Sequence, residues 1–297
     1  MQSSIISYPN RGPWGNSQWR GNASGRVYKD LFEQLKPKVF TDPMVGSGTS
    51  VEVAREMNIE AYGLDLMSGF NATNDSILDA VGKESDMVVS HPPYGAMILY
   101  SGNVWGDQAH PDDLSRCIDD ADFHEKMQLV LLNQRMATKA NGFYGTLIGD
   151  WRRGGVYTSY QAELIARMPK DELAAVIIKT QHNCVSDSKV YANLKLPRIV
   201  HEYLILWQKK AAPVMVLLQK MAQEHAARLA GTWKNIVRMV VMAIGKSATL
   251  ESIYKMVERD APDRLVNNPN WKAKIRQVLN QNRDLFQSVD RGVWALA

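Results

Sequence analysis

The chain has 297 residues, enough for one sizeable α/β core with a small appended domain. Its 45% hydrophobic and 22% charged residues are typical of a soluble globular protein, and no apolar run approaches the roughly 20 residues of a membrane span. Residues 1–14 lack the charged-then-apolar layout of a signal peptide, so the sequence predicts a cytoplasmic protein. Cys117 and Cys184 lie far apart without a Cys-x-x-Cys spacing, which argues against a disulfide framework and against a zinc or other metal site.

Charge is distributed unevenly along the chain, although the net charge is only +4. From Lys210 onward there are 14 Lys and Arg against 7 Asp and Glu, whereas the residues before it hold 21 and 24. A basic C-terminal third beside a slightly acidic body indicates a surface for a polyanion, although solvated faces are often rich in lysine.

The first 27 residues are rich in Gly, Asn, Ser, Arg and Trp and show no period, so we expect an irregular arm. Its tryptophans would suit either a loop over a ligand or a lid that only covers the sheet. Apolar spacing then predicts a helix over 27–35, and a short strand follows at 38–41.

A glycine-containing loop, Asp42-Pro43-Met44-Val45-Gly46-Ser47-Gly48-Thr49, links this strand to a helix predicted from Ser50. Glycines let a backbone come close to a ligand, and a helix N-terminus presents unpaired N–H groups. The loop therefore predicts a pocket for a polar small molecule. Taken alone it would suit many nucleotide cofactors, but the G-x-G-x-x-G spacing of dinucleotide sites is absent.

A second strand at 61–64 ends in Asp65. Because the carboxyl ends of adjacent parallel strands line one crevice, we expect Asp65 beside the glycine loop, where its carboxylate could bind two ribose hydroxyls. A simple loop acid or helix cap is the alternative. The polar turn at 71–75 would bring Asn71 or Asp75 to the adenine end of such a ligand.

The next strand, 86–89, leads into Ser90-His91-Pro92-Pro93-Tyr94. Two consecutive prolines impose a rigid extended backbone without N–H donors, so the nearby carbonyl groups are fixed acceptors. The tyrosine after them offers a flat face for stacking. This combination suits a planar ring that carries an amino group.

Both runs resemble motifs of the amino-group DNA methyltransferases. The run from Asp42 to Thr49 resembles their cofactor motif D-P-F-x-G-S-G-T, and His91-Pro-Pro-Tyr94 resembles their catalytic D/N/S-P-P-Y/F/W. Alternating helices and strands over 127–207, ending in H-E-Y-x-L, are similar to the second half of the same core. The resemblance covers about 13–209 and implies an α/β fold with a Rossmann-like methyltransferase core.

The resemblance also implies transfer of a methyl group from S-adenosylmethionine to an exocyclic amino group in double-stranded DNA. Adenine N6 is the first choice, with cytosine N4 or an RNA base as alternatives. The implied catalytic residues are His91, Pro92, Pro93 and Tyr94; the Pro92 carbonyl would bind the amino group, and Tyr94 would stack on a flipped base. The implied cofactor-binding residues are Asp42, Pro43, Gly46, Ser47, Gly48, Thr49, Asp65, Asn71 and Asp75.

His91 departs from this motif, which usually has Asp, Asn or Ser at that position. A neutral imidazole offers one acceptor nitrogen if its other nitrogen is held as the donor, whereas a protonated imidazole cannot accept. Activity should therefore fall below about pH 6.5 if a neutral His91 is needed. A DNA-binding regulator that keeps the cofactor pocket but lacks catalysis is the alternative class of function.

Base recognition must come from outside the span between Thr49 and His91, because that span is too short for a reading domain. Candidates are 95–123, 181–198 and the tail. Arg152 and Arg153 follow a strand end on the crevice side and would meet phosphate, unless they form only a solvated basic turn.

The domain organisation that we predict is a methyltransferase domain at 1–210, a linking helix at 211–231 and a DNA-binding domain at 232–297. Helices are expected over 232–244, 249–259 and 269–281, and then two strands around a turn at 290–292. Three helices and this hairpin, with F-x-x-x-x-x-G-V-W-x-L, resemble a small winged-helix (α+β) domain, a fold that also serves in protein contacts. Its nucleic-acid contacts would be Asn270, Lys272, Lys274, Arg276 and Arg291.

The chain lacks any nuclease-like or helicase-like segment, which favours a stand-alone methylase. The recognition sequence and a cognate restriction partner stay open. So does the oligomeric state, for which a homodimer is one candidate.

Overall fold

The computed structural model describes residues 3–182, 195–212, 214–245, 247–260, 265 and 268–297. The chain divides into two compact units, 1–217 and 218–297, each with its own core. Cys184 and most of the 181–198 stretch lie outside the described residues, whereas Cys117 is a free thiol.

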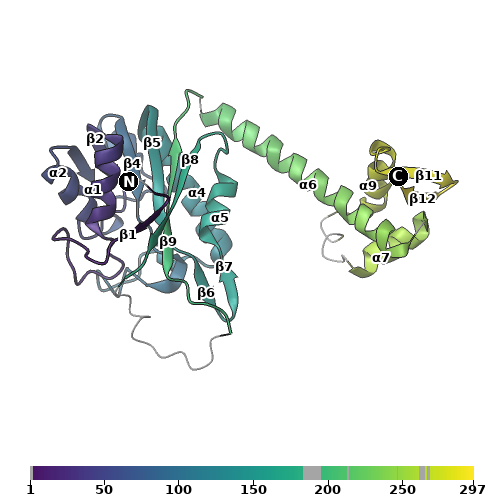
Figure 1. Ribbon diagram of the computed structural model, residues 1–297, viewed down its shortest axis with the longest axis horizontal. Coiled ribbons are helices and arrows are strands. Elements are labelled where there is room, and N and C mark those ends of the chain that lie inside the picture. The colour runs from purple at the N-terminus through teal and green to yellow at the C-terminus, as the bar shows by residue number, and fades with distance from the viewer. Residues whose placement is uncertain (1–2, 183–194, 213, 246, 261–264, 266–267) are drawn as a thin grey trace. The chain divides into compact units, whose positions relative to one another are not determined.

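A seven-stranded sheet forms the centre of the first unit, in the order β1-β8-β9-β5-β4-β2-β3 (Figure 1). β9 runs antiparallel to both of its neighbours, β5 and β8, and the other adjacent pairs are parallel. This is a Rossmann-like α/β arrangement, as the sequence predicted. The strands are β1 (Ile5–Ser7), β2 (Val39–Asp42), β3 (Glu60–Gly63), β4 (Ser85–Ser90), β5 (Thr138–Ile148), β8 (Leu173–Thr180) and β9 (His201–Gln208).

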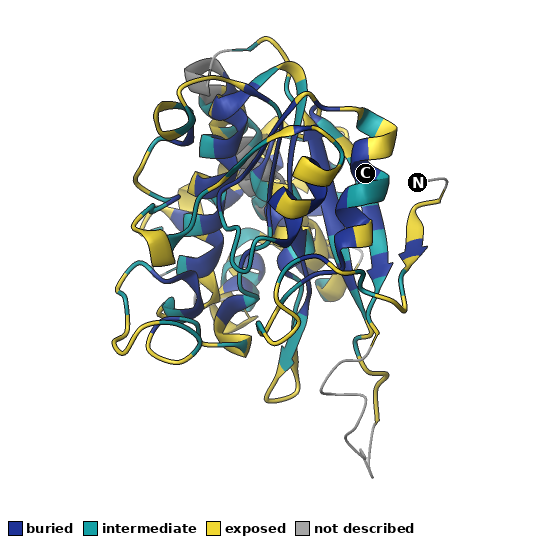
Figure 2. Cartoon of the chain, turned by 90° about the vertical axis from the view of Figure 1, so that its left-hand side faces the viewer, coloured by how far each residue is buried: buried dark blue, intermediate teal, exposed yellow. Residues whose placement is uncertain are grey.

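Helices cover both faces of this sheet, and the pleat of β4 decides which side chain meets which layer. Met87 and Val89 belong to the core shared with helices α1 (Gly25–Leu35) and α2 (Thr49–Glu56). Val88 points to the other face, where it packs with α3 (Ile77–Val81) and the end of α4 (Asp120–Ala137). Helix α5 (Tyr160–Arg167) packs on α4 through an edge contact between Tyr160 and Phe123. Figure 2 shows the resulting buried centre between helices with exposed outer sides.

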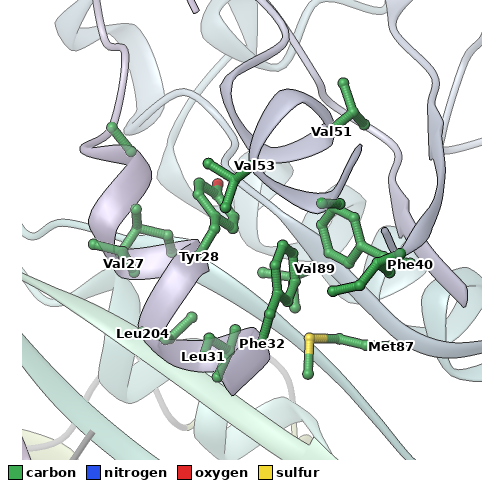
Figure 3. Close-up of a cluster of buried hydrophobic side chains, with 14 of the residues drawn as sticks. Val27, Tyr28, Leu31, Phe32, Phe40, Val51, Val53, Met87, Val89 and Leu204 are labelled. Atoms are coloured by element: carbon green, nitrogen blue, oxygen red, sulfur yellow. The ribbon is translucent and has the colours of Figure 1, made fainter. Parts of the chain in front are cut away.

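The core under α1 follows from its sequence. Ser24 caps the helix, its hydroxyl accepting from the Arg26 N–H, and apolar residues at helical spacing then face the sheet. Phe32 meets Phe40 of β2 edge to face, with 4.8 Å between ring centroids (Figure 3). This packing fixes the strand that leads into the glycine loop.

The register of the strands brings three loops together. Asp42 at the end of β2 is paired with Gly63 of β3, and Thr41 is paired with Val88 of β4. The carboxyl ends of the three strands therefore adjoin, and so do the loops that begin at Asp42, Asp65 and His91. Short 3₁₀ turns follow at η1 (Leu66–Ser68), η2 (Gly95–Met97) and η3 (Leu114–Arg116).

One prediction for the first unit was wrong. Residues 5–7 of the expected irregular arm form β1, which pairs in parallel with β8; a three-residue strand is too short to show a period. After Asp150, a segment for which the sequence predicted no strands, the chain forms a hairpin of β6 (Trp151–Arg153) and β7 (Val156–Thr158). Its tight turn uses Gly154 and Gly155, both at positive φ.

The second unit packs helices on a three-stranded sheet of order β10-β12-β11. The expected break between a linking helix and a helix capped by Thr232 is absent, because α6 (Val214–Ile244) continues through it. A single glycine before Thr232 costs only about 1 kcal/mol inside a helix, which good helix formers around it offset. The remaining elements are β10 (Ala248–Thr249), α7 (Leu250–Asp260), α9 (Trp271–Gln281), β11 (Phe286–Asp290) and β12 (Val293–Leu296).

The local signals in this second unit match the structure well. Thr249 accepts from the Ser252 N–H at 3.1 Å, as expected of a cap. Gly292 turns the hairpin at φ 73°. The α9 face predicted to be buried is buried: Trp271, Ile275, Val278 and Leu279.

Candidate functional site

A cavity of about 890 Å³, part of it open to solvent, lies where β2, β3 and β4 end. Of the predicted residues it is lined by Asp42, Pro43, Gly46, Ser47, Thr49, Asp65, Asn71, His91 and Pro93. The glycine loop and the His-Pro-Pro run therefore share one cavity.

Asp42 closes the inner wall and is almost fully buried. One carboxylate oxygen accepts from the Met44 N–H at 2.9 Å, and the other accepts from the Ser50 hydroxyl at 2.5 Å. Burial nevertheless raises the pKa of Asp42 to about 7, and the hydrogen bonds oppose this only in part.

Asp65 lies beside the glycine loop, as predicted. One of its oxygens accepts from the Gly46 N–H at 2.9 Å, and the other caps η1 through the Met67 N–H at 2.9 Å. The cap that was considered as an alternative role is thus present together with the loop contact. Each carboxylate oxygen keeps a lone pair for a ligand hydroxyl, and burial raises the pKa of Asp65.

The glycine loop presents polar groups that the protein itself leaves without partners. Gly46 and Gly48 adopt φ 49° and 91°, which other residues rarely adopt. No side chain caps the N-terminus of α2 after Gly48. The Ser47 hydroxyl is buried and has no hydrogen-bond partner among the described residues. A polar ligand fits these groups, because it would supply the missing partners.

Asn71 and Asp75 take different places. Asn71 lines the cavity, and its side-chain oxygen accepts from the Thr73 N–H at 3.0 Å. Asp75 is not in the cavity wall; its carboxylate accepts from the Asn71 N–H at 2.7 Å and so shapes the turn. Gly48 is not in the cavity wall either; its positive φ shapes the loop before α2.

The His91 edge of the cavity is held by a buried network. The Tyr94 hydroxyl donates to Glu202, which is paired with Lys179, and it lies 2.9 Å from His91 Nε2. The Tyr94 ring lies against Gly149, where an added Cβ would come within 2.6 Å of it. Burial lowers the pKa of His91 although Glu202 opposes this, so the imidazole is neutral at pH 7. Pro92 is buried behind this edge.

Aromatic and acidic residues that the sequence did not single out complete the wall. Trp19 covers the loop, lying 3.2 Å from where a Cβ on Gly46 would be, whereas Trp14 is buried in the core. Trp19 therefore belongs to the cavity wall, and Trp14 belongs to the core that includes α1 and α2. No local motif marks the remaining residues, which come together only in the fold: Tyr28, Tyr100, Trp105, Asp112 and Asp113.

The hairpin β6–β7 leaves the sheet at the same edge. Asp150 anchors it by accepting from the Tyr157 hydroxyl at 2.8 Å. Arg152 lies over the Tyr157 ring at 5.3 Å and donates to the Pro197 carbonyl, while Arg153 is exposed and lies over the Trp151 ring at 5.5 Å. Both arginines therefore lie on strand β6 of the hairpin.

Two of the predicted contact residues of the second unit meet Tyr254 of α7. Lys272 lies over this ring at 5.5 Å, and Arg276 donates to its hydroxyl at 3.1 Å. Lys274 donates to Gln277, Arg291 is exposed beside Gly292, and Asn270 is exposed at the start of α9. We call these four cationic residues, Lys272, Lys274, Arg276 and Arg291, the basic surface of the second unit.

Within the described residues, no set of His, Cys, Asp and Glu side chains could hold a metal ion. None of the helices described is both long and apolar enough to cross a bilayer.

No family model and no curated protein matches the sequence. Solved structures do match, among them TrmN from Thermus thermophilus, with 14% identity over 65% of this chain and 51% of that one and a TM-score of 0.41. A candidate DNA modification methylase from Thermus thermophilus, complexed with S-adenosyl-L-methionine, is 16% identical over 59% and 56%, with a TM-score of 0.29. The 16S rRNA N2 methyltransferase RsmC from the same species, in complex with AdoMet and guanosine, is 14% identical over 66% and 45%, with a TM-score of 0.36. This chain spans about half the length of each.

Proposed function

We propose that this protein transfers a methyl group from S-adenosylmethionine to an exocyclic amino group of a base, with adenine N6 in double-stranded DNA as the first choice. The observation that carries the proposal is a cavity lined both by the Asp42–Thr49 loop and by His91 and Pro93. A nucleotide-like cofactor and a planar amino-bearing base need these two kinds of surface side by side.

In this proposal, the residues that would hold the cofactor are those whose polar groups face the cavity. Asp65 would bind ribose hydroxyls, the Gly46–Thr49 backbone and Ser47 would hold the polar chain, and Asn71 would bind the adenine. When bound, the cofactor supplies an electrophilic methyl group. Asp75 would act through the turn that positions Asn71.

The base would be held by the His91 edge. Neutral His91 offers an acceptor nitrogen for the amino group, Pro92 contributes a rigid backbone carbonyl, and Tyr94 presents a fixed ring. Holding the amino nitrogen in line with the methyl group accounts for most of the rate gain in such a transfer. A base in a duplex reaches this edge only after it is flipped out of the stack.

For nucleic-acid binding, we propose the two arginines of the β6–β7 hairpin together with the basic surface of the second unit. The second unit would act as a winged-helix domain at 232–297. It would contact DNA through Asn270, Lys272, Lys274 and Arg276, and Arg291 would lie in the wing. Both sets are suited to phosphate contacts, which position a protein on DNA without reading its sequence.

The test is a nucleoside digest after incubation with cofactor labelled on its methyl group, run in parallel on unmethylated DNA and on RNA. We expect label in N6-methyladenosine of DNA, and loss of label with His91→Ala. The matched control is His124→Gln, which replaces a second buried histidine that lies outside the cavity wall.

Other products would redirect the proposal. Label in N4-methylcytosine would change the base, and label in RNA alone would overturn the DNA substrate. Bound cofactor with no transfer would identify a regulator instead of an enzyme.

A further inference from the structure

Four polar side chains form one hydrogen-bonded chain that ends at His91. Lys179 of β8 donates to Glu202 of β9, Glu202 accepts from the Tyr94 hydroxyl, and the Tyr94 oxygen lies 2.9 Å from His91 Nε2. Lys179 and Glu202 face each other across the two strands and are both buried. Neither residue lines the cavity.

We propose that Lys179 and Glu202 are positioning residues that, through Tyr94, hold His91 as the Nε2–H tautomer and leave its Nδ1 as the acceptor facing the cavity. The inference rests on the methyl transfer proposed above for the importance of that acceptor. The tautomer itself follows from the contacts alone.

The direction of the hydrogen bonds is set at the Lys179 end. An ammonium group can only donate, and an ionised carboxylate can only accept, so Glu202 takes the single hydrogen of the Tyr94 hydroxyl. The Tyr94 oxygen then has only lone pairs left for His91. The proton between them therefore belongs to His91 Nε2.

The charges of the buried groups agree with this assignment. Burial alone would raise the pKa of Glu202, but the nearby Lys179 ammonium and the hydrogen bonds from Lys179 and Tyr94 hold it below its ordinary value. Burial also keeps His91 neutral. A neutral imidazole has one N–H only, so placing it on Nε2 leaves a lone pair on Nδ1.

The lone pair on Nδ1 is free for a ligand. No hydrogen bond joins Nδ1 to any of the described residues, and His91 forms part of the cavity wall. In the opposite tautomer, the ring would present a donor to an amino group, and two donors cannot bond. The orientation of the chain thus decides whether His91 can bind an amino-bearing base.

A buried Lys–Glu pair is a costly way to join two strands, since desolvation often outweighs the attraction between the charges. A pair that only stabilised the sheet would have no need of Tyr94 and His91. The proposal explains why a fixed charge is present: a neutral amide at position 202 could donate or accept and would not set a direction.

The experiment is ¹⁵N NMR of the full chain labelled in its six histidine rings, recorded without cofactor or DNA near pH 7.5. The His91 signals are assigned by their loss in His91→Asn. We expect Nε2 to be protonated and Nδ1 to be unprotonated in the wild type. A protonated Nδ1 in the wild type would overturn the inference.

Two variants test the chain of contacts. Tyr94→Phe keeps the ring and the ion pair but removes the link, and Lys179→Met with Glu202→Gln removes both charges so that neither is left unpaired. Both should yield averaged signals from two tautomers. The control is Tyr8→Phe, which deletes another hydroxyl–carboxylate bond, to Asp30, outside the cavity and its network. A single Nε2–H tautomer that persists in both test variants would contradict the proposal.

Transfer kinetics separate this inference from the proposed function. Tyr94→Phe should lower kcat more than it changes the KM for cofactor, because only the acceptor is disturbed. A fixed Nε2–H tautomer in a protein that methylates nothing would leave the inference standing and remove the function. Methyl transfer by a protein whose His91 is the Nδ1–H tautomer would support the proposed function and overturn this inference.

Discussion

Asp42 lies at the end of β2, and its carboxyl group is buried in the wall of the cavity. Its pKa is about 7 in the folded chain, well above the roughly 3.9 of an unfolded chain. Between these values the folded state keeps a proton that the unfolded state has lost. Stability from this group is therefore lost as the pH rises through that window.

We predict that Asp42→Asn removes this dependence. The free energy of unfolding of the variant minus that of the wild type should increase by about 3 kcal/mol between pH 4 and pH 7.5, as measured by urea denaturation. Asp79→Asn, which changes an exposed carboxyl in α3, is the control. A difference that is equal at both pH values would show that folding does not raise the pKa of Asp42.

Gly149 matters for the position of Tyr94, because a Cβ there would come within 2.6 Å of the Tyr94 ring. Gly149→Ala should push the ring away and lower kcat by up to about 100-fold, the scale expected for a displacement of about 1 Å. Cofactor affinity should stay the same, since Gly149 is outside the cavity wall. The control is Ala80→Ser, which adds one atom at an exposed position of α3. Equal kcat in both variants would mean that the place of the Tyr94 ring is unimportant.

The pH profile of the proposed reaction also depends on a single residue. The sequence alone placed the loss of activity near the ordinary pKa of histidine, about 6.5. Burial lowers the pKa of His91, so the neutral acceptor should persist to lower pH. We predict a constant kcat from about pH 6.5 to 8 and a fall only below this range, measured with stopped-time methylation assays. A fall that begins at higher pH would contradict a buried, neutral His91.

Among the elements, the β6–β7 hairpin is anchored by the Asp150–Tyr157 hydrogen bond and carries two arginines. Arg153 is exposed, whereas Arg152 also holds the Pro197 carbonyl and covers Tyr157. Arg153→Ala should weaken DNA binding and reduce the slope of log K against log salt by about 1, the change expected when one phosphate is no longer neutralised. Lys83→Ala is the control, because Lys83 precedes the N-terminal end of β4, whereas the hairpin follows the C-terminal end of β5. An unchanged slope would make the hairpin a solvated surface only.

At the scale of helices and strands, the sequence predicted the elements that carry a clear local pattern. Strands that end in Asp42 and near Asp65 and His91, and the buried face of α9, all carry a period or a turn signal and were found as expected. β1 and the β6–β7 hairpin are three-residue strands, too short for a period to show. The continuity of α6 through Thr232 was missed because a good capping residue can also lie inside a long helix.

The candidate site divides in the same way. Most residues of the two motifs could be placed at one cavity because parallel strands bring their ends together, although Gly48, Pro92 and Tyr94 are not in its wall. Tyr100, Trp105 and Asp113 line the same cavity from a loop with no motif, and Lys179 and Glu202 reach Tyr94 from strands far along the chain. Such contacts are set by tertiary packing, which one sequence does not display.

At the scale of the molecule, the two units separate the proposed chemistry from the basic surface of the second unit. All residues of the cavity wall lie within 1–217, whereas Lys272, Lys274 and Arg276 lie within 218–297. We predict that replacing these three by Ala in the full chain weakens binding to DNA of any sequence and lowers its salt slope by about 0.9 for each phosphate that the variant no longer neutralises.

Cofactor affinity, measured by calorimetry, should not change in this triple variant. Unchanged DNA binding would instead favour a protein-contact role for the second unit, the alternative use of a winged-helix domain.

The place of β9 in the sheet has a consequence for how the protein matures. β8 leaves the ribosome before β9, yet β9 is the strand that joins β8 and β1 to the rest of the sheet. Until β9 inserts, the edge of β8 that faces β5 has unpaired backbone groups. Partly folded chains with such unpaired strand edges are prone to aggregation. The same late strand carries Glu202, the residue that contacts Tyr94. The contact that we propose to orient His91 therefore forms only when the sheet is complete, so a partly folded chain would have the glycine loop without an oriented His91.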